Sequence, residues 1–185
     1  MLSRTLEVDE TSLVLRSQNG DWEAFGALVR CHRPGVINVI YRMCGDAHLA
    51  EDAAQISLIR AWQHLPGFQP ESSFRNWLYR IAVNAALDII RKEKWSASIE
   101  NLEAADQGDS LDTHVEKQKR IEQVRRAVLS LPEASRAALI LREYEGLSYH
   151  EIAVTLEISP GTVMSRLNYA RKRLAELLQD CMEDL

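Results

Sequence analysis

The sequence predicts an all-α fold built from two small helical domains, and three observations support this. Apolar residues recur at helical spacing through almost the whole chain, and no stretch alternates apolar and polar residues for the length of a strand. A short acidic segment divides the chain at residues 96–114. A helix-turn-helix pattern follows it, at residues 148–178.

The charge distribution sets the expected domain boundaries. Residues 1–95 and 115–185 each hold 11 basic and 11 acidic residues, so the formal charge of −5 lies entirely in residues 96–114. That segment has few large apolar residues and many Ser, Asp, Gln and Ala, the composition of an exposed linker. We therefore expect a first domain at 10–95, an acidic linker at 96–114 and a second domain at 115–181.

Several classes of protein are excluded by composition. No apolar run approaches the roughly 20 residues that cross a bilayer, and the first residues lack the pattern of a signal peptide, so we expect a cytoplasmic protein. Cys31, Cys44 and Cys181 do not form a disulfide framework, and they are expected as reduced thiols, with Cys31 and Cys44 among helical core positions. The spacing of Cys31, His32, Cys44 and His48 matches no zinc site. We expect no metal, no cofactor and no small-molecule substrate.

Local signals place the helices in order. Asn19-Gly20 ends the first helix, Pro34 is expected to interrupt the second, and Pro66-Gly67 follows the third. In the first domain the expected helices are Glu10–Gln18, Asp21–Cys44 with an interruption at Pro34, Asp46–Leu65 and Phe74–Lys94. In the second domain they are Val115–Ser130, Glu133–Tyr144, Ser148–Glu157 and Ser159–Gln179.

The helix-turn-helix pattern has a second helix with two different faces. Ser148 and Glu151 form a capping box for the first helix, and Ser159-Pro160 begins the second. Apolar residues at helical spacing face a core, whereas residues 161–175 contain four basic residues and no acidic one. Small, amide and basic side chains on one face suit a DNA major groove. A helical hairpin with a basic, solvated back is the structural alternative.

The expected helix at 74–94 has a second side rich in amides and arginines. Asn76, Arg80 and Asn84 recur at steps of four, close to Phe68, Phe74 and Trp77 in the preceding loop and first turn. Aromatic rings can stack on an unpaired base while amides read its edge and arginines hold phosphates. Aromatics packed in the core beside solvated polar residues explain the pattern equally well.

The expected helix at 46–65 carries an acidic and amide stripe. Asp52 and Gln55 lie three residues apart, with Glu51 adjacent and Ile59 one turn further along. Acidic and amide residues near a helix start can simply complement the helix dipole, and this is the favoured interpretation for the helix taken alone.

Taken in order, these segments resemble the extracytoplasmic-function sigma factors of bacterial RNA polymerase. The resemblance rests on EDAAQISLIRAW, FRNWLYRIAVNAALDIIRK, the acidic linker and LPEASRAALILREYEGLSYHEIAVTLEISPGTVMSRLNYARKRL, and it covers roughly residues 12–180. The resemblance is specific because two unrelated modules carry family signatures in the right order. It implies a region-2 domain and a region-4 domain.

The resemblance also implies roles for individual residues. The helix that docks on core RNA polymerase corresponds to Glu51, Asp52, Gln55 and Ile59. The surface that captures the flipped base of the minus-ten element corresponds to Phe68, Ser72, Phe74, Arg75, Asn76, Trp77, Arg80, Asn84, Arg91 and Lys92. The helix that reads the minus-thirty-five element corresponds to Ser159, Gly161, Thr162, Met164, Ser165, Arg166, Asn168, Tyr169, Arg171 and Lys172. The linker corresponds to the segment that threads the RNA path of the polymerase.

The implied partners are core RNA polymerase, promoter DNA and an inhibitory anti-sigma factor, free or membrane-anchored. Two departures from the family pattern stand out. Ile56 and Leu58 replace the Glu and aromatic residue that usually follow the D-x-x-Q motif, and Met164 replaces a common basic residue. Because each domain is close to neutral, we expect weak DNA binding without polymerase.

Two other classes of function remain as alternatives. A conventional helix-turn-helix regulator predicts dimers and palindromic half-sites, but no dimer helix is evident and FRNWLYRIAVN would have no role. An enzyme is disfavoured because the chain has no P-loop, nucleotide-binding glycine pattern, H-E-x-x-H or nucleophile elbow.

Overall fold

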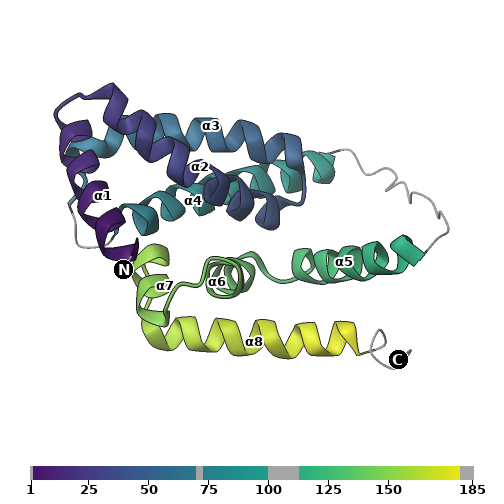
Figure 1. Cartoon of the computed structure of the whole chain (residues 1–185). Coiled ribbons are helices and arrows are strands. Elements are labelled where there is room, and N and C mark those ends of the chain that lie inside the picture. Colours follow the sequence, from purple (N-terminus) through teal and green to yellow (C-terminus); the bar gives the residue numbers. More distant parts are fainter. Residues whose placement is uncertain (1, 70–72, 100–112, 180–185) are drawn as a thin grey trace.

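The computed structural model describes residues 2–69, 73–99 and 113–179, and within them the chain is helical without strands (Figure 1). Side chains are described for residues 10–69, 73–93 and 118–179. The first domain contains α1 (Leu2–Gln18), α2 (Trp22–Cys44), α3 (Ala47–His64), the 3-10 turn η1 (Leu65–Gly67) and α4 (Phe74–Ile99). The second contains α5 (Thr113–Leu129), α6 (Glu133–Glu143), α7 (Tyr149–Leu156) and α8 (Pro160–Leu178). The all-α prediction is confirmed.

Side-chain caps and a left-handed glycine fix where several helices begin and end. Asp21 accepts a hydrogen bond from the Ala24 amide at 3.0 Å, and Asp46 accepts one from the Leu49 amide at 2.8 Å. Each bond satisfies an amide that has no partner inside its own helix. Gly45 ends α2 with φ +84° and donates its amide to the Tyr41 carbonyl.

The prediction that Pro34 interrupts the second helix is wrong, because α2 is continuous through it. Proline removes one intrahelical bond, yet Val36, Val39 and Ile40 just beyond it are fully buried. Burying these side chains outweighs a penalty of about 3 kcal/mol for proline inside a helix.

Other helix boundaries also differ from the sequence expectation. The first helix already begins at Leu2, and α4 continues to Ile99, into the segment assigned to the linker. Cys31 is exposed rather than a core residue, and Cys44 is half-buried. Cys181 lies outside the described residues.

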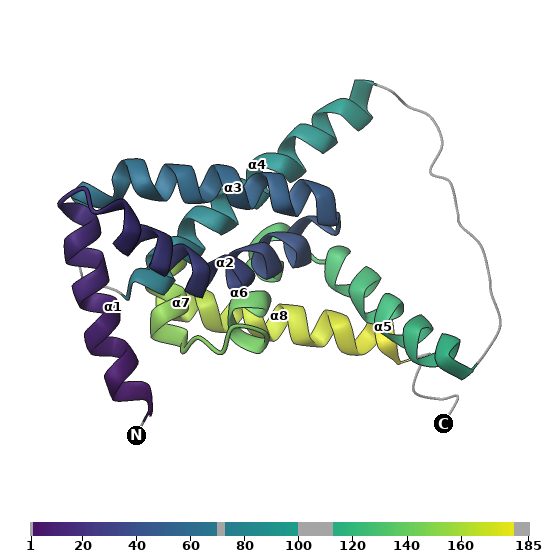
Figure 2. The ribbon, with the colours of Figure 1, turned by 45° about the horizontal axis from the view of Figure 1, so that its top comes forward.

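The first domain is a bundle in which α2, α3 and α4 pack on one another and α1 crosses one end (Figure 2). In the second domain α8 packs against α5, α6 and α7. Within the described part of the chain, no helix combines the length and hydropathy that crossing a membrane requires.

The two domains are in direct contact. α7 packs on α4, and both α5 and α6 pack on α2, so one continuous apolar cluster includes residues of both domains. Figure 1 shows α6 and α7 between the first domain and α8. Sequence reasoning treated the domains as separate modules and did not predict this packing.

Candidate functional site

The outward face of α8 carries the residues predicted to read duplex DNA. Ser159 caps the helix by accepting the Thr162 amide at 3.1 Å, and Val163, Leu167 and Ala170 are completely buried beneath it. The opposite face is therefore turned away from the core. The predicted minus-thirty-five residues on it are all exposed or half-buried: Ser159, Gly161, Thr162, Met164, Ser165, Arg166, Asn168, Tyr169, Arg171 and Lys172.

Polar contacts orient one arginine of this face. Arg171 donates to a Glu143 carboxylate oxygen at 2.8 Å and to the Tyr149 hydroxyl at 3.3 Å. The bond to Glu143 is the main reason why the pKa of Arg171 is raised, so the guanidinium stays charged. Met164 and Tyr169 are half exposed, at 52% and 50%, and Met164 supplies an uncharged surface where a basic residue is common in the resembled family.

The predicted polymerase-docking residues lie together on the outer side of α3. Glu51, Asp52, Gln55 and Ile59 are all exposed. Ile56 joins them at 50% exposure, so the face combines carboxylates with two exposed isoleucines. Leu58, the second departure from the family pattern, instead packs in the core. In Figure 1, α3 and α8 lie on opposite sides of the molecule.

The aromatic residues of the predicted minus-ten surface are core residues in this structure. Phe68, Phe74 and Trp77 are each more than nine-tenths buried. The ring centroids of Phe68 and Trp77 lie 5.0 Å apart, and those of Phe74 and Trp77 lie 5.6 Å apart. The three rings pack on one another, which agrees with the packing alternative for this segment.

The polar residues of the same surface contact the second domain. Asn76 Nδ2 donates to Glu151 Oε1 at 3.3 Å, and Arg80 Nη1 donates to Glu157 Oε1 at 2.5 Å. Arg75 Nη2 lies 3.5 Å from the Glu145 carbonyl oxygen. The second domain thus supplies these acceptors from α7 and from the residues directly before and after it.

The remaining predicted minus-ten residues lie further along α4. Asn84, Arg91 and Lys92 are exposed, and Arg91 donates to Asp88 at 3.0 Å. Asn84 and Arg91 line a groove of about 290 Å³ whose other wall includes Arg166 of α8. Ser72 lies outside the described residues.

A tyrosine contact between the domains was missed by sequence reasoning. The Tyr79 hydroxyl donates to a Glu145 carboxylate oxygen, and both burial and this bond raise the pKa of Tyr79. The signal in the sequence is that Glu145, Glu151 and Glu157 are spaced six residues apart in a stretch that contains no Lys or Arg.

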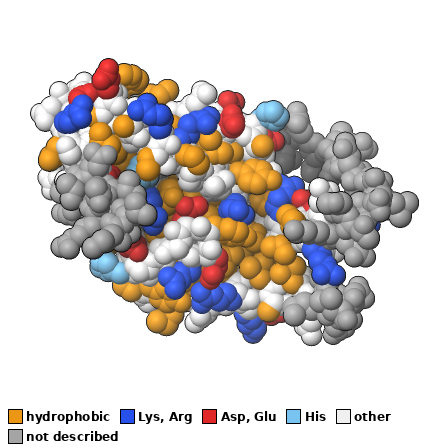
Figure 3. Space-filling view, in the orientation of Figure 1, with side chains coloured by type: hydrophobic (Ala, Val, Ile, Leu, Met, Phe, Trp, Pro, Cys, Tyr) orange, Lys and Arg blue, Asp and Glu red, His pale blue; other side chains and the backbone are white. Residues whose placement is uncertain are grey.

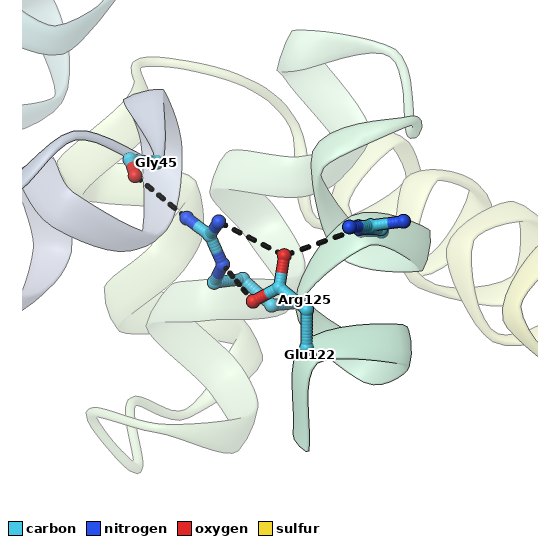
Figure 4. A network of polar contacts seen from close by, with 4 residues as sticks. Gly45, Glu122 and Arg125 are labelled. Atoms are coloured by element: carbon cyan, nitrogen blue, oxygen red, sulfur yellow. Dashed lines mark hydrogen bonds and ion pairs between the residues drawn. The ribbon is translucent and has the colours of Figure 1, made fainter. Parts of the chain in front are cut away.

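Two arginines of the second domain hold the C-terminal end of α2. Arg125 donates to the Gly45 carbonyl at 2.6 Å and is itself held by Glu122 at 2.7 Å (Figure 4). Arg136, only 8% exposed, donates to the Met43 carbonyl and to two carbonyls of its own domain. Cations near a helix C-terminus complement its dipole, so these contacts favour the packed arrangement.

An apolar groove follows the same boundary between the domains. It has a volume of about 520 Å³, and hydrophobic side chains gather there in the space-filling view (Figure 3). Its lining residues are Tyr41, Arg42, Arg120, Ile121, Val124, Arg125, Val128 and Tyr144. The guanidinium of Arg42 lies 3.6 Å from the ring centroid of Tyr144, joining the domains across this groove.

Comparison with known proteins matches both domains to family models. Residues 28–96 match sigma-70 region 2 and residues 121–174 match sigma-70 region 4. The chain is 37% identical to the RNA polymerase sigma-H factor of Pseudomonas aeruginosa, over 97% of this chain and 98% of that protein. It is 30% identical to the ECF RNA polymerase sigma factor SigW of Bacillus subtilis, over 88% and 93%.

Solved structures show the same fold. The structure of CnrH in complex with the cytosolic domain of CnrY has a TM-score of 0.73 at 24% identity, covering 93% of this chain and 98% of that one. The sigma factor RpoE of Bartonella quintana, in complex with the anti-sigma factor NepR, has a TM-score of 0.66 at 26% identity, covering 84% and 96%. With two family models in order and relatives matched over nearly their full length, the chain belongs to the extracytoplasmic-function sigma factors of bacterial RNA polymerase.

Proposed function

We propose that this sigma factor uses α3 to bind core RNA polymerase, α8 to bind upstream duplex DNA and α4 to hold separated DNA downstream. Sigma factors are non-enzymatic initiation factors that direct the polymerase to promoters. The observation that carries the proposal is the outward face of α8, because its small, amide and basic side chains lie over a buried apolar face in a helix-turn-helix.

On α8, the proposed division of labour follows side-chain chemistry. Asn168 and Ser165 can hydrogen-bond to base edges in the major groove, whereas Arg166, Arg171 and Lys172 suit phosphates. Phosphate contacts supply most of the affinity and fix the register, and the few base-edge contacts supply selectivity.

On α4, the exposed amide of Asn84 and the basic Arg91 and Lys92 are proposed to hold the non-template strand. Stacking a base on an aromatic ring is worth about 1–3 kcal/mol, comparable to the cost of unstacking it from the duplex. Phe68 and Trp77 can contribute stacking only after their surroundings rearrange, because both rings are buried in the arrangement described above.

The docking face on α3 is proposed to combine two kinds of contact. Glu51, Asp52 and Gln55 offer acceptors for basic and amide groups of the polymerase, and Ile56 and Ile59 offer exposed apolar area. Ile56 thus provides hydrophobic contact where many family members have a carboxylate. We place this activity in the cytoplasm, where bacterial polymerase acts.

We also propose an anti-sigma factor as a partner, since the solved structures of RpoE and CnrH each contain a bound partner. The groove between the domains suits an amphipathic helix of that partner. Ile121, Val124 and Tyr144 offer apolar contact, and Arg42 and Arg120, which also line the groove, favour acidic side chains.

Run-off transcription tests the proposed function. Core polymerase is incubated with genomic fragments and the wild-type chain, Asn84→Ala or Asn38→Ala. Asn38 is a matched control because it is an exposed asparagine on α2, outside all the proposed surfaces.

Selective transcripts that persist with Asn38→Ala and disappear with Asn84→Ala support base capture by α4. Unchanged transcripts with Asn84→Ala would show that Asn84 is not needed for base capture. If the wild-type chain fails to redirect the polymerase to any fragment, the proposed function itself is refuted.

A further inference from the structure

We propose that this sigma factor inhibits itself, with α7 acting as a lid over the DNA-binding surface of α4. The inference rests on the proposed function, because the covered residues are those proposed to hold the minus-ten strand. It adds that the free chain adopts a closed state and that the lid must lift before single-stranded DNA can bind.

The lid closes a cavity at the predicted site of base capture. The cavity has a volume of about 260 Å³, and the first domain contributes most of its lining, including Phe68, Trp77 and Arg80. The remaining lining residues, Val154 and Thr155, belong to α7. A strand approaching the cavity from the side of the second domain therefore meets α7.

Carboxylates of the second domain occupy the donors that DNA would need. Asn76 donates to Glu151 and Arg80 donates to Glu157, at 3.3 Å and 2.5 Å. An amide and a guanidinium are the groups that bind base edges and phosphates, and here they bind glutamates. The glutamate carboxylates thus occupy the donors of α4 that phosphates and base edges of a DNA strand would otherwise bind.

Tyr79 gives the lid a third attachment, less exposed to solvent. Its hydroxyl donates to Glu145, which lies in the turn just before α7. Burial raises the pKa of Tyr79, so the hydroxyl stays protonated and remains a donor throughout the neutral range. Arg75, which also faces Glu145, opposes that rise through its positive charge without cancelling it.

Two features of the contact between α4 and the second domain lower the cost of opening the closed state. Arg80 and Glu157 are 38% and 71% exposed, so water and salt screen their ion pair. Asn76 Oδ1 and Thr155 Oγ1 are buried at this boundary without a hydrogen-bond partner. Unpaired buried acceptors and hydroxyls favour exposure to water, which lowers the cost of lifting the lid.

The test compares two double variants of the full chain. Glu145→Ala with Glu157→Ala removes two attachments of the lid. Glu23→Ala with Glu176→Ala is the control, because it removes the same charge at two exposed positions that take no part in the lid contacts and are not among the proposed DNA-binding residues. This match matters, since losing negative charge alone strengthens DNA binding.

Two quantities are measured without polymerase. Small-angle X-ray scattering gives the radius of gyration, and fluorescence anisotropy gives the affinity for a labelled, random-sequence, single-stranded DNA pool. We expect the lid variant to have a larger radius of gyration than the control. We expect it to bind the pool roughly 5- to 30-fold more tightly. The closed state competes with DNA for the surface of α4, and the variant lacks one or two modest contacts that stabilise the closed state.

Equal radii and equal affinities in the two double variants would overturn the proposal. An increase in the radius of gyration without tighter DNA binding would also overturn it. The surface of α4 would then be exposed, yet its affinity for single-stranded DNA would be unchanged. Glu157→Gln alone, at an exposed position, repeats the comparison with little risk to folding. The transcription assay with Asn84→Ala remains an independent test of the proposed function.

Discussion

Replacing Gly45 by alanine tests whether the contact between the domains is tight at the C-terminal end of α2. Gly45 has φ +84°, and a Cβ atom there would lie 2.7 Å from Leu129 Cδ1 of α5. Gly20 and Gly146 have similar values, φ +89° and +71°, but their added Cβ atoms would meet nothing within 4 Å. The three glycines therefore separate backbone strain from a steric contact.

The expected costs follow from this difference. A left-handed backbone costs an L-residue about 1–2 kcal/mol relative to glycine, and all three variants carry this cost. Only Gly45→Ala also displaces Leu129, and moving a side chain away from its rotamer costs roughly 0.5–1.5 kcal/mol. We expect Gly45→Ala to reduce the free energy of unfolding by about 1.5–3.5 kcal/mol, the sum of the two costs, against about 1–2 kcal/mol for the other two.

Urea denaturation followed by circular dichroism measures these differences. Adding Leu129→Ala completes a double-mutant cycle, in which the extra cost of Gly45→Ala should vanish because the obstructing side chain is gone. Equal destabilisation by all three glycine variants would refute the reasoning. An extra cost at Gly45 that survives Leu129→Ala would refute it as well.

Two further predictions concern a buried histidine and a helix cap. Burial, assisted by the charge of Arg75, lowers the pKa of His32 from 6.5, so the unfolded chain binds the proton more readily and stability falls as pH drops below about 6.5. In His32→Leu, the urea midpoint of unfolding should therefore change less between pH 7.5 and pH 5.5 than in the wild type. The same pH dependence in both proteins would contradict this prediction. Ser148→Ala removes the cap of α7 and should cost about 1 kcal/mol, lowering the Tm by roughly 2–4 °C. Ser130→Ala, whose hydroxyl only donates to a preceding carbonyl, should change the Tm less, and equal shifts would argue against capping.

The starts of the four helices with side-chain caps could be predicted because their signals are local. Asp21, Asp46, Ser148 and Ser159 all cap helices in the structure, as their sequence context indicates. Pro34 misled the prediction because the outcome there depends on how much apolar surface the flanking residues bury, which only the tertiary structure decides.

The state of the minus-ten surface could not be predicted from the sequence. Aromatic residues beside amides fit both a base-binding surface and a packed core, and the choice depends on what covers them. The covering contacts join residues far apart in the chain, 66 positions for Tyr79 with Glu145 and 77 for Arg80 with Glu157. Pairs so far apart in the chain do not show in the hydrophobic periodicity from which the helices were predicted.

The position of α7 has a consequence for protein engineering. This eight-residue helix packs on α8 within its own domain and on α4 of the other, so one short element contributes to the packing of both domains. Exchanging the second domain for that of a relative, in order to retarget transcription, would also replace the partner surface of α4. Such chimeras should be designed with α4 and α7 taken from the same parent.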